Sequence, residues 1–323
     1  MKYVLLGTTG VQVSELCLGT MTFGKEADRS ASRAIYRRCR DAGINFFDCA
    51  DVYSSGEAER ILGDLTAGER QQLILTSKVG GSMGAGPNRE GLSRRHLLQE
   101  CEASLRRLNT DWIDVYFAHR FDPIVPIEES LHAFDFLVQQ GKVRYIGVSN
   151  WAAWQIARAL GVCAFKGFQP IRVIQPMYNL VKRQAEVELF PLAQDAGLGV
   201  MAYNPLGGGV LTGKYGLAPD QTAGRLRENA MYRRRYAEPW MFEAAQGLKA
   251  IGTDVGVSPM SLAVAWAAHH PAVTCPIIGA RSVEQLEPAL KAPEIELSAE
   301  LCQRLSALAP SPPPATDRSD DRK

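Results

Sequence analysis

The segment "CRDAGINFFD", at residues 39–48, joins the end of a helical stretch to a glycine and then to a short apolar strand. The same plan recurs in "VQQGKVRYIGVS" at 138–149 and in "AQDAGLGVMAYN" at 193–204. In each segment the glycine suits the left-handed backbone position that ends a helix, and the apolar run after it suits a strand covered on both faces. Helices and strands are therefore predicted to alternate along the chain.

Eight apolar runs have the length of a strand, and stretches with helical periodicity lie between them. In one such stretch Ile127, Leu131, Phe134 and Val138 follow one another at helical spacing, and Ser93 is predicted to cap another helix. The predicted strands are residues 16–19, 44–48, 73–77, 113–118, 143–148, 172–175, 198–203 and 274–278.

Eight strands that alternate with helices predict an α/β fold, a parallel (β/α)8 TIM barrel, whose usual size is about 250 residues plus insertions. The longest interval between strands, residues 204–257, predicts an enlarged loop after strand seven. A doubly wound sheet is the alternative, but "CLGTMTFG" at 17–24 contains no Gly-x-Gly-x-x-Gly. Residues 1–308 are predicted to form one barrel domain, and the proline-rich, charged end at 309–323 is predicted to be disordered.

The composition favours a small-molecule ligand over a charged macromolecule. The chain has 323 residues, of which 46% are hydrophobic, and its 36 basic and 35 acidic side chains leave a formal charge of +1. No overall field therefore attracts nucleic acid or an anionic membrane. Seven cysteines without a Cys-x-x-Cys pair suggest a reducing compartment, and no long apolar run or export signal is present, so we expect a cytoplasmic protein.

Polar side chains close three successive predicted strands. Asp48, Lys78 and His119 end strands two, three and four, and Tyr53 begins the loop after strand two. Taken singly, each has an ordinary alternative role. Asp48 could cap a helix, Lys78 could be a surface cation, His119 a core histidine and Tyr53 an interfacial ring. Strand ends converge at one mouth of a barrel, however, and buried charges must pair, so we expect the four side chains to meet.

This group could reduce a carbonyl. An ammonium at Lys78, held by Asp48, is expected to lower the pKa of the Tyr53 phenol below its usual value of about 10. The phenol could then give its proton to a carbonyl oxygen as hydride reaches the carbon, with His119 orienting that oxygen. No His-x-His or carboxylate cluster closes the strands, so no metal is predicted, and a metal-dependent hydrolase is disfavoured.

Asp48, Tyr53 and Lys78 lie within ordered blocks that resemble the aldo-keto reductase family, of the longer bacterial kind related to potassium-channel β subunits. The resemblance covers about residues 1–290 and implies an eight-stranded barrel that binds NADPH without a Rossmann domain. It makes Tyr53 the proton donor, Lys78 and Asp48 its tuning pair, and His119 the substrate-orienting group. The matching blocks are "LGTTGVQVSELCLGTMTFG", "NFFDCADVYSSGEAERILG", "ILTSK", "GKVRYIGVSNW", "IQPMYNL", "AYNPLGGGVLTGKY" and "PIIGARSVEQL".

The resemblance also implies which residues bind the cofactor. Ser149, Asn150 and Gln175 match positions that hold the nicotinamide amide, and Tyr203 matches the aromatic ring stacked on the nicotinamide. Alternatively, Ser149 and Asn150 cap the next helix, and Gln175 serves only the backbone. The other implied contacts are Gly19, Thr20, Met21, Asp48, Asn204, Pro205, Leu206, Gly207, Gly209, Lys214, Arg225, Gly279, Arg281 and Gln285.

Two segments suit phosphate groups. Residues 208–214 spell Gly-x-x-x-x-Gly-Lys, as do residues 19–25, but Tyr215 and Glu26 follow where an ATPase needs Ser or Thr for magnesium. The glycines at 208–214 could instead cradle a pyrophosphate. Arg281 follows strand eight, where its guanidinium could fork onto the 2′-phosphate that distinguishes NADPH from NADH; otherwise it faces solvent.

The sequence departs from the family pattern at the adenine end. Pro288 and Ala289 stand where relatives often have polar residues that hold adenine, and Arg225 is the candidate to compensate. Phe23, Trp151 and residues 232–240 could form an apolar substrate pocket or could equally be ordinary surface packing. The basic run at 233–235 is interpreted as a solvated face.

Two functions remain open. The first is an NADPH-dependent reductase that converts aldehydes or ketones into alcohols, with a small-molecule carbonyl compound as its substrate. The alternative is an NADPH-binding regulatory subunit that senses redox state and turns over slowly.

Overall fold

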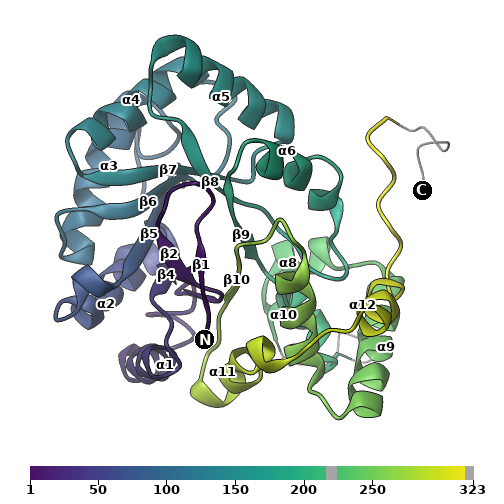
Figure 1. The fold of residues 1–323 in the computed structure, drawn as a ribbon. Helices are drawn as coiled ribbons and strands as arrows, with labels where there is room; N and C mark the ends of the chain where they lie inside the picture. The colour runs from purple at the N-terminus through teal and green to yellow at the C-terminus, as the bar shows by residue number, and fades with distance from the viewer. Residues whose placement is uncertain (216–223, 317–323) are drawn as a thin grey trace.

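The chain folds into a closed barrel of eight parallel strands with helices around it (Figure 1). The computed structural model describes residues 1–215 and 224–316; within this range the side chains of Arg225 and Arg227 are not described. The barrel strands are β3 (Cys17–Gly19), β4 (Phe46–Asp48), β5 (Ile74–Val79), β6 (Ile113–Ala118), β7 (Val143–Ser149), β8 (Ile171–Gln175), β9 (Gly199–Tyr203) and β10 (Cys275–Ile278).

The predicted barrel is confirmed strand by strand. All eight predicted runs are strands, and β10 pairs with both β3 and β9, which closes the sheet. Gly43, Gly141 and Gly197 adopt positive φ angles of 88°, 72° and 64°, as expected of residues that end helices. Ser93 caps its helix as predicted, because its hydroxyl accepts the backbone N–H of His96 at 3.3 Å.

Helices and short 3-10 turns fill the connections between the strands. In chain order up to β9 they are α1 (Arg29–Asp41), η1 (Tyr53–Gly56), α2 (Glu57–Thr66), η2 (Arg70–Gln72), α3 (Arg94–Leu108), α4 (Ile127–Gln139), α5 (Ala153–Lys166), η3 (Gln184–Glu186) and α6 (Leu189–Asp195). After β9 they are η4 (Gly207–Thr212), α7 (Arg225–Glu228), α8 (Ala230–Arg235), α9 (Pro239–Val255), α10 (Pro259–His269), α11 (Val283–Leu290), η6 (Ala292–Glu294) and α12 (Ala299–Ser306).

The enlarged connection predicted after strand seven follows β9 and carries helices of its own. Within residues 204–257 the described part contains one 3-10 turn and three helices, η4, α7, α8 and α9. The predicted enlargement after strand seven is therefore present, and its helices bury apolar residues such as Tyr232 and Leu248. None of the described helices has both the length and the apolar character needed to cross a membrane.

A hairpin that the sequence did not predict closes the N-terminal end of the barrel. It consists of β1 (Tyr3–Leu5) and β2 (Gln12–Ser14), which pair antiparallel. Leu6 is fully buried among the side chains of the barrel interior, and the backbone N–H of Ser14 donates to Asn45 Oδ1 at 2.7 Å, just before β4. The barrel mouth at the other end is left for a ligand.

The predicted disordered tail, residues 309–323, lies partly beyond the described residues, which end at 316. Its disorder, and the extent of the barrel domain at 1–308, stay predictions.

Candidate active site

A cavity of about 670 Å³ opens at the C-terminal ends of the barrel strands. Most of the predicted site residues line it, although they come from seven different strands or the connections after them. The predicted residues on its wall are Gly19, Met21, Asp48, Tyr53, His119, Ser149, Asn150, Gln175, Tyr203, Asn204, Pro205, Leu206, Gly209, Lys214, Gly279, Arg281 and Gln285.

Four predicted residues lie elsewhere or are not described. Lys78 is buried behind the wall, next to Asp48. Thr20 is also buried, and its hydroxyl donates to the main-chain oxygen of Asp48 at 3.0 Å, so it supports the end of β4. Gly207 is buried at the start of η4, and the side chain of Arg225 lies outside the described part of the chain.

Asp48, Lys78 and Tyr53 form a hydrogen-bonded cluster at the floor of the cavity. Lys78 Nζ lies 2.6 Å from Asp48 Oδ2 and 3.3 Å from the Tyr53 hydroxyl, and it donates to the main-chain oxygen of Cys49 at 2.7 Å. The Lys78 side chain is 0% exposed. The expected pairing of the buried charges is therefore present, with the ammonium between the carboxylate and the phenol.

Asp48 receives further donors on its second oxygen. Thr76 Oγ1 donates to Asp48 Oδ1 at 2.7 Å, and Gln175 Nε2 donates to the same atom at 2.8 Å. The first bond comes from the neighbouring strand β5, and the second reaches from β8 across the barrel mouth to β4. They satisfy a carboxylate that is almost wholly buried and fix its direction.

The expected lowering of the Tyr53 pKa is not found. Burial raises the pKa of the phenol well above its usual value, and attraction to the Lys78 ammonium offsets this only in part. For Lys78, burial is the largest single influence and opposes the charge, but attraction to Asp48 and Tyr53 and the hydrogen bond to Asp48 together outweigh it and raise the pKa of the ammonium. The neighbouring charge alone would lower the pKa of the phenol, but the loss of solvent around it has the larger effect.

His119 lies beside the phenol. The centroids of the Tyr53 and His119 rings are 6.1 Å apart and the rings meet edge to face. Burial lowers the pKa of His119 to about 3, helped by the positive charge of Lys78. The imidazole is therefore neutral near pH 7 and can offer one N–H donor to a ligand.

The residues predicted to hold an amide group are linked to one another. Tyr203 Oη donates to Asn150 Oδ1 at 2.7 Å, and Asn150 Nδ2 donates to the main-chain oxygen of His119 at 2.9 Å. Ser149 Oγ donates to the main-chain oxygen of Gln175 at 2.8 Å. The alternative role of Ser149 and Asn150 as helix caps is wrong, because α5 begins at Ala153 with Ala152 in the capping position.

The far end of the cavity has the features of a phosphate site. Gly208 and Gly209 adopt positive φ angles of 63° and 99°, which turn the backbone of η4 toward the cavity. Lys214 and Arg281 bring positive charge to the same wall. Arg281 is not simply solvent-facing, because its Nη2 lies 3.1 Å from Glu228 Oε2, and the two side chains are 32% and 53% exposed.

The sequence missed several residues of the wall. Arg235 lines the cavity, so the prediction of a solvated face is wrong at this position. Phe23 and Trp151, candidates for the wall of the substrate pocket, are instead buried away from it. For Met231, Arg235 and Met260 no periodic signal could have shown that they line the cavity, because the packing of α8 and α10 at the mouth decides which of their residues point inward. The missed residues are Thr22, Thr212, Met231, Arg235, Met260, Ile277, Ile278 and Ala280, whereas Gly208 and Tyr232 lie in segments that were predicted to contribute to the site.

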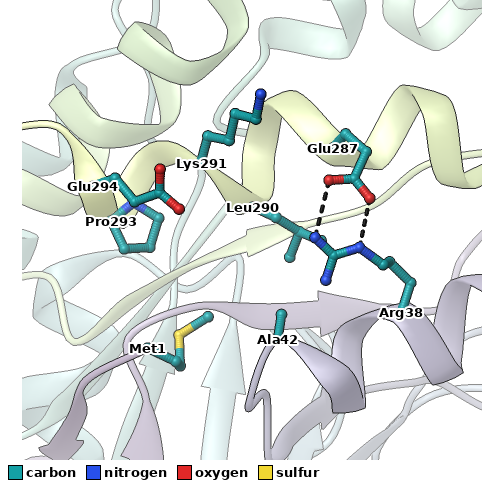
Figure 2. A pocket seen from close by; sticks show the side chains of 8 residues that line it. All are labelled: Met1, Arg38, Ala42, Glu287, Leu290, Lys291, Pro293 and Glu294. Carbon is teal, nitrogen blue, oxygen red and sulfur yellow. Dashed lines mark hydrogen bonds and ion pairs between the residues drawn. The ribbon is translucent and has the colours of Figure 1, made fainter.

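Pro288 belongs to α11 and does not line the cavity. Its main-chain oxygen accepts the hydroxyl of Ser261 at 2.6 Å, which joins α11 to α10. A second hollow, of about 220 Å³, lies against α1 and α11 beside Met1 (Figure 2). There Arg38 donates to both oxygens of Glu287, at 2.5 and 3.0 Å, so its guanidinium is already neutralised.

No group of three or more His, Cys, Asp or Glu side chains in the described part of the chain is arranged to hold a metal ion. The site instead combines a closed α/β barrel with a buried carboxylate, ammonium and phenol at its mouth, an arrangement suited to proton transfer beside an organic ligand.

Comparison with known proteins gives the family. Residues 15–310 match the model of the Aldo/keto reductase family, so the chain belongs to this family. It is 36% identical to the "Probable voltage-gated potassium channel subunit beta" of Oryza sativa over 98% of this chain and 99% of that protein. The Arabidopsis thaliana protein of the same name is 37% identical over 91% and 92%. The "Uncharacterized oxidoreductase YrpG" of Bacillus subtilis is 36% identical, over 97% of both chains. Membership of the family supports an oxidoreductase activity.

Proposed function

We propose that this protein is a cytoplasmic, NADPH-dependent reductase that converts an aldehyde or ketone into an alcohol, with Tyr53 as the proton donor. The observation that carries the proposal is the contact of the Tyr53 hydroxyl with the buried Lys78 ammonium at 3.3 Å, on the wall of a cavity large enough for a cofactor and a substrate.

The described residues fit the cofactor. Gly208 and Gly209 line the wall without side chains beside the cations Lys214 and Arg281, which leaves room and positive charge for a diphosphate. Their own N–H groups already donate to Asn204 Oδ1 and to the main-chain oxygen of Leu206. At the floor, Tyr203 offers an aromatic face and Asn150 a carboxamide, which suit a nicotinamide. NADPH bound there would supply a hydride to the carbonyl carbon.

The protein groups would move the proton. The raised pKa keeps the Tyr53 phenol protonated near pH 7, so it can donate a hydrogen bond to the carbonyl oxygen. As negative charge grows on that oxygen, the phenol releases its proton, and the Lys78 ammonium stabilises the phenolate that remains. Neutral His119 cannot compete as the acid, but its N–H can orient the oxygen.

Tyr53→Phe tests the proposal. This change removes one oxygen and leaves Lys78 paired with Asp48, so the fold should persist while turnover falls by at least ~100-fold. The measurement is NADPH oxidation with a panel of aldehydes and ketones, alongside the Kd for NADPH from its fluorescence. Near-normal turnover in this variant would show that Tyr53 is not the proton donor.

The named relatives favour a second candidate. Because two of them are named as potassium channel β subunits, an NADPH-binding regulatory subunit with slow turnover is the alternative. Stopped-flow oxidation of bound NADPH separates the two functions. Rapid oxidation in a single turnover supports the reductase, whereas NADPH that binds tightly and resists every carbonyl supports the regulatory subunit.

A further inference from the structure

The backbone directly after Tyr53 is left-handed at three successive residues. Ser54, Ser55 and Gly56 have φ angles of 49°, 53° and 88°. Serine rarely adopts such angles, and a backbone of this kind persists only where the surrounding packing holds it. Since Tyr53 begins this turn, whatever holds the turn also sets the direction of the phenol.

Arg107 of α3 packs against the turn from one side. A Cβ atom added at Gly56 would lie 2.7 Å from Arg107 Cδ and 3.0 Å from its Nε, so the arginine stem lies directly on the glycine backbone. On the other side the Ser54 hydroxyl donates to the main-chain oxygen of Phe23 at 2.7 Å. The left-handed turn is therefore held between α3 and the loop after β3.

Buried carboxylates fix the Arg107 guanidinium. Its Nε donates to Glu59 Oε2 at 2.6 Å, and its Nη2 donates to Glu100 and, at 3.1 Å, to the hydroxyl of Ser104. The Arg107 side chain is only 12% exposed and that of Glu59 is fully buried. A planar guanidinium with donors in two directions can bridge both carboxylates, whereas an ammonium cannot reproduce this fork.

The same network reaches the strand that carries Lys78. Glu59 Oε1 accepts the hydroxyl of Ser77 at 2.5 Å, and Ser77 is the residue before Lys78 in β5. Glu59 thus joins the backbone that presents the ammonium to the arginine that supports the turn after the phenol. Neither Arg107 nor Glu59 lines the cavity.

We propose that Arg107, held by Glu59, is a positioning residue that keeps the Tyr53 phenol at its working distance from Lys78 and from a bound carbonyl group. This inference rests on the proposed reductase function. It predicts that loosening Arg107 slows the chemical step and leaves cofactor binding intact, because the network lies behind the wall and touches none of the predicted cofactor residues.

The first test compares Arg107→Gln with Arg106→Gln. Arg106 is the exposed neighbour on the same helix, so it controls for the loss of one charge. Misplacing a reacting group by about 1 Å can cost ~100-fold in rate. We expect Arg107→Gln to slow single-turnover NADPH oxidation by at least ~10-fold, with the Kd for NADPH within about threefold of wild type. The Arg106 variant should match wild type.

Two further variants keep the inference testable if Arg107→Gln does not fold. Arg107→Lys retains the charge but not the fork, and should recover only part of the rate. Gly56→Ala retains Arg107 but forces a methyl group against its stem at a positive φ, so it should slow the same step. Normal rates in all the folded variants would overturn the proposal.

A double-mutant cycle with Tyr53→Phe separates positioning from general stability. If Arg107 acts through the phenol, Arg107→Gln should lower the rate at least ~10-fold in wild type but less than about twofold in the Tyr53→Phe background. Equal losses in both backgrounds would mean that Arg107 has only a structural role, and would overturn the inference.

Failure of the reductase function itself would look different. In that case the wild-type protein binds NADPH, but none of the carbonyl compounds causes the bound NADPH to be oxidised. The positioning role of Arg107 is then judged by amide hydrogen exchange. Faster exchange at residues 53–57 in Arg107→Gln, with Arg106→Gln unchanged, would support the role in holding the turn. Unchanged exchange there would refute it.

Discussion

Replacing Lys78 by methionine is the sharpest test of how the floor of the site is built. Methionine keeps most of the volume and removes the charge, so Asp48 loses the ammonium at 2.6 Å but keeps the donors from Thr76 and Gln175 at 2.7 and 2.8 Å. Removing one partner of a buried ion pair costs about 3–5 kcal/mol. Because two donors remain, we expect the lower value, about 3 kcal/mol, in the free energy of unfolding.

The assay is urea unfolding at pH 7 without cofactor, followed by tryptophan fluorescence. The matched control is Asp48→Asn/Lys78→Met, which removes both charges and should regain at least half of the lost stability while carbonyl reduction stays abolished. A single variant within about 1 kcal/mol of wild type would refute the reasoning, as would a double variant no more stable than the single one.

Three other predictions follow from described contacts. Glu228→Gln frees Arg281 from a partly exposed ion pair, so the Kd for NADPH should fall about two- to fivefold while that for NADH stays constant; equal changes would contradict a 2′-phosphate role. Burial raises the pKa of Asp51 to about 8, whereas an unfolded Asp titrates at ~3.9, so the fold loses stability as pH rises from about 4 to about 8 and no further above that; Asp51→Asn should flatten the decline in unfolding free energy between pH 6 and 8 by up to about 1.4 kcal/mol per pH unit, and an unchanged slope would contradict it. Gly208→Ala places a Cβ 2.5 Å from a Tyr232 ring carbon at a positive φ, so NADPH titration should show weaker binding, and unaltered affinity would remove η4 from the site.

The barrel could be predicted from the sequence because fully buried parallel strands are continuous apolar runs, and a glycine marks the helix end before several of them. The residues at strand ends could be predicted to converge because the C-terminal ends of barrel strands meet at one mouth, and Asp48, Tyr53 and His119 do share one cavity. The hairpin could not be predicted, since "YVL" and "QVS" are too short to show alternation.

The other differences between the sequence-based predictions and the structure arise from the surroundings of a residue rather than from its type. The pKa of Tyr53 depends on how much water surrounds the phenol, which spacing along the chain does not reveal. Arg107 contacts Glu59 and Gly56, which precede it in the chain by 48 and 51 positions. No local sequence pattern encodes contacts over such a separation. Arg235 was misjudged because only the packing of α8 shows which of three successive arginines faces inward.

The hairpin at the beginning of the chain has a practical consequence. It seals the face of the barrel opposite the mouth, and Met1 lies on that side, next to Ala42 at the end of α1 (Figure 1). A purification tag or a tether to a solid support attached at Met1 would therefore point away from the entrance used by ligands. In protein immobilised through Met1, ligands should therefore reach the cavity as easily as in the free protein. This format is convenient for screening carbonyl compounds.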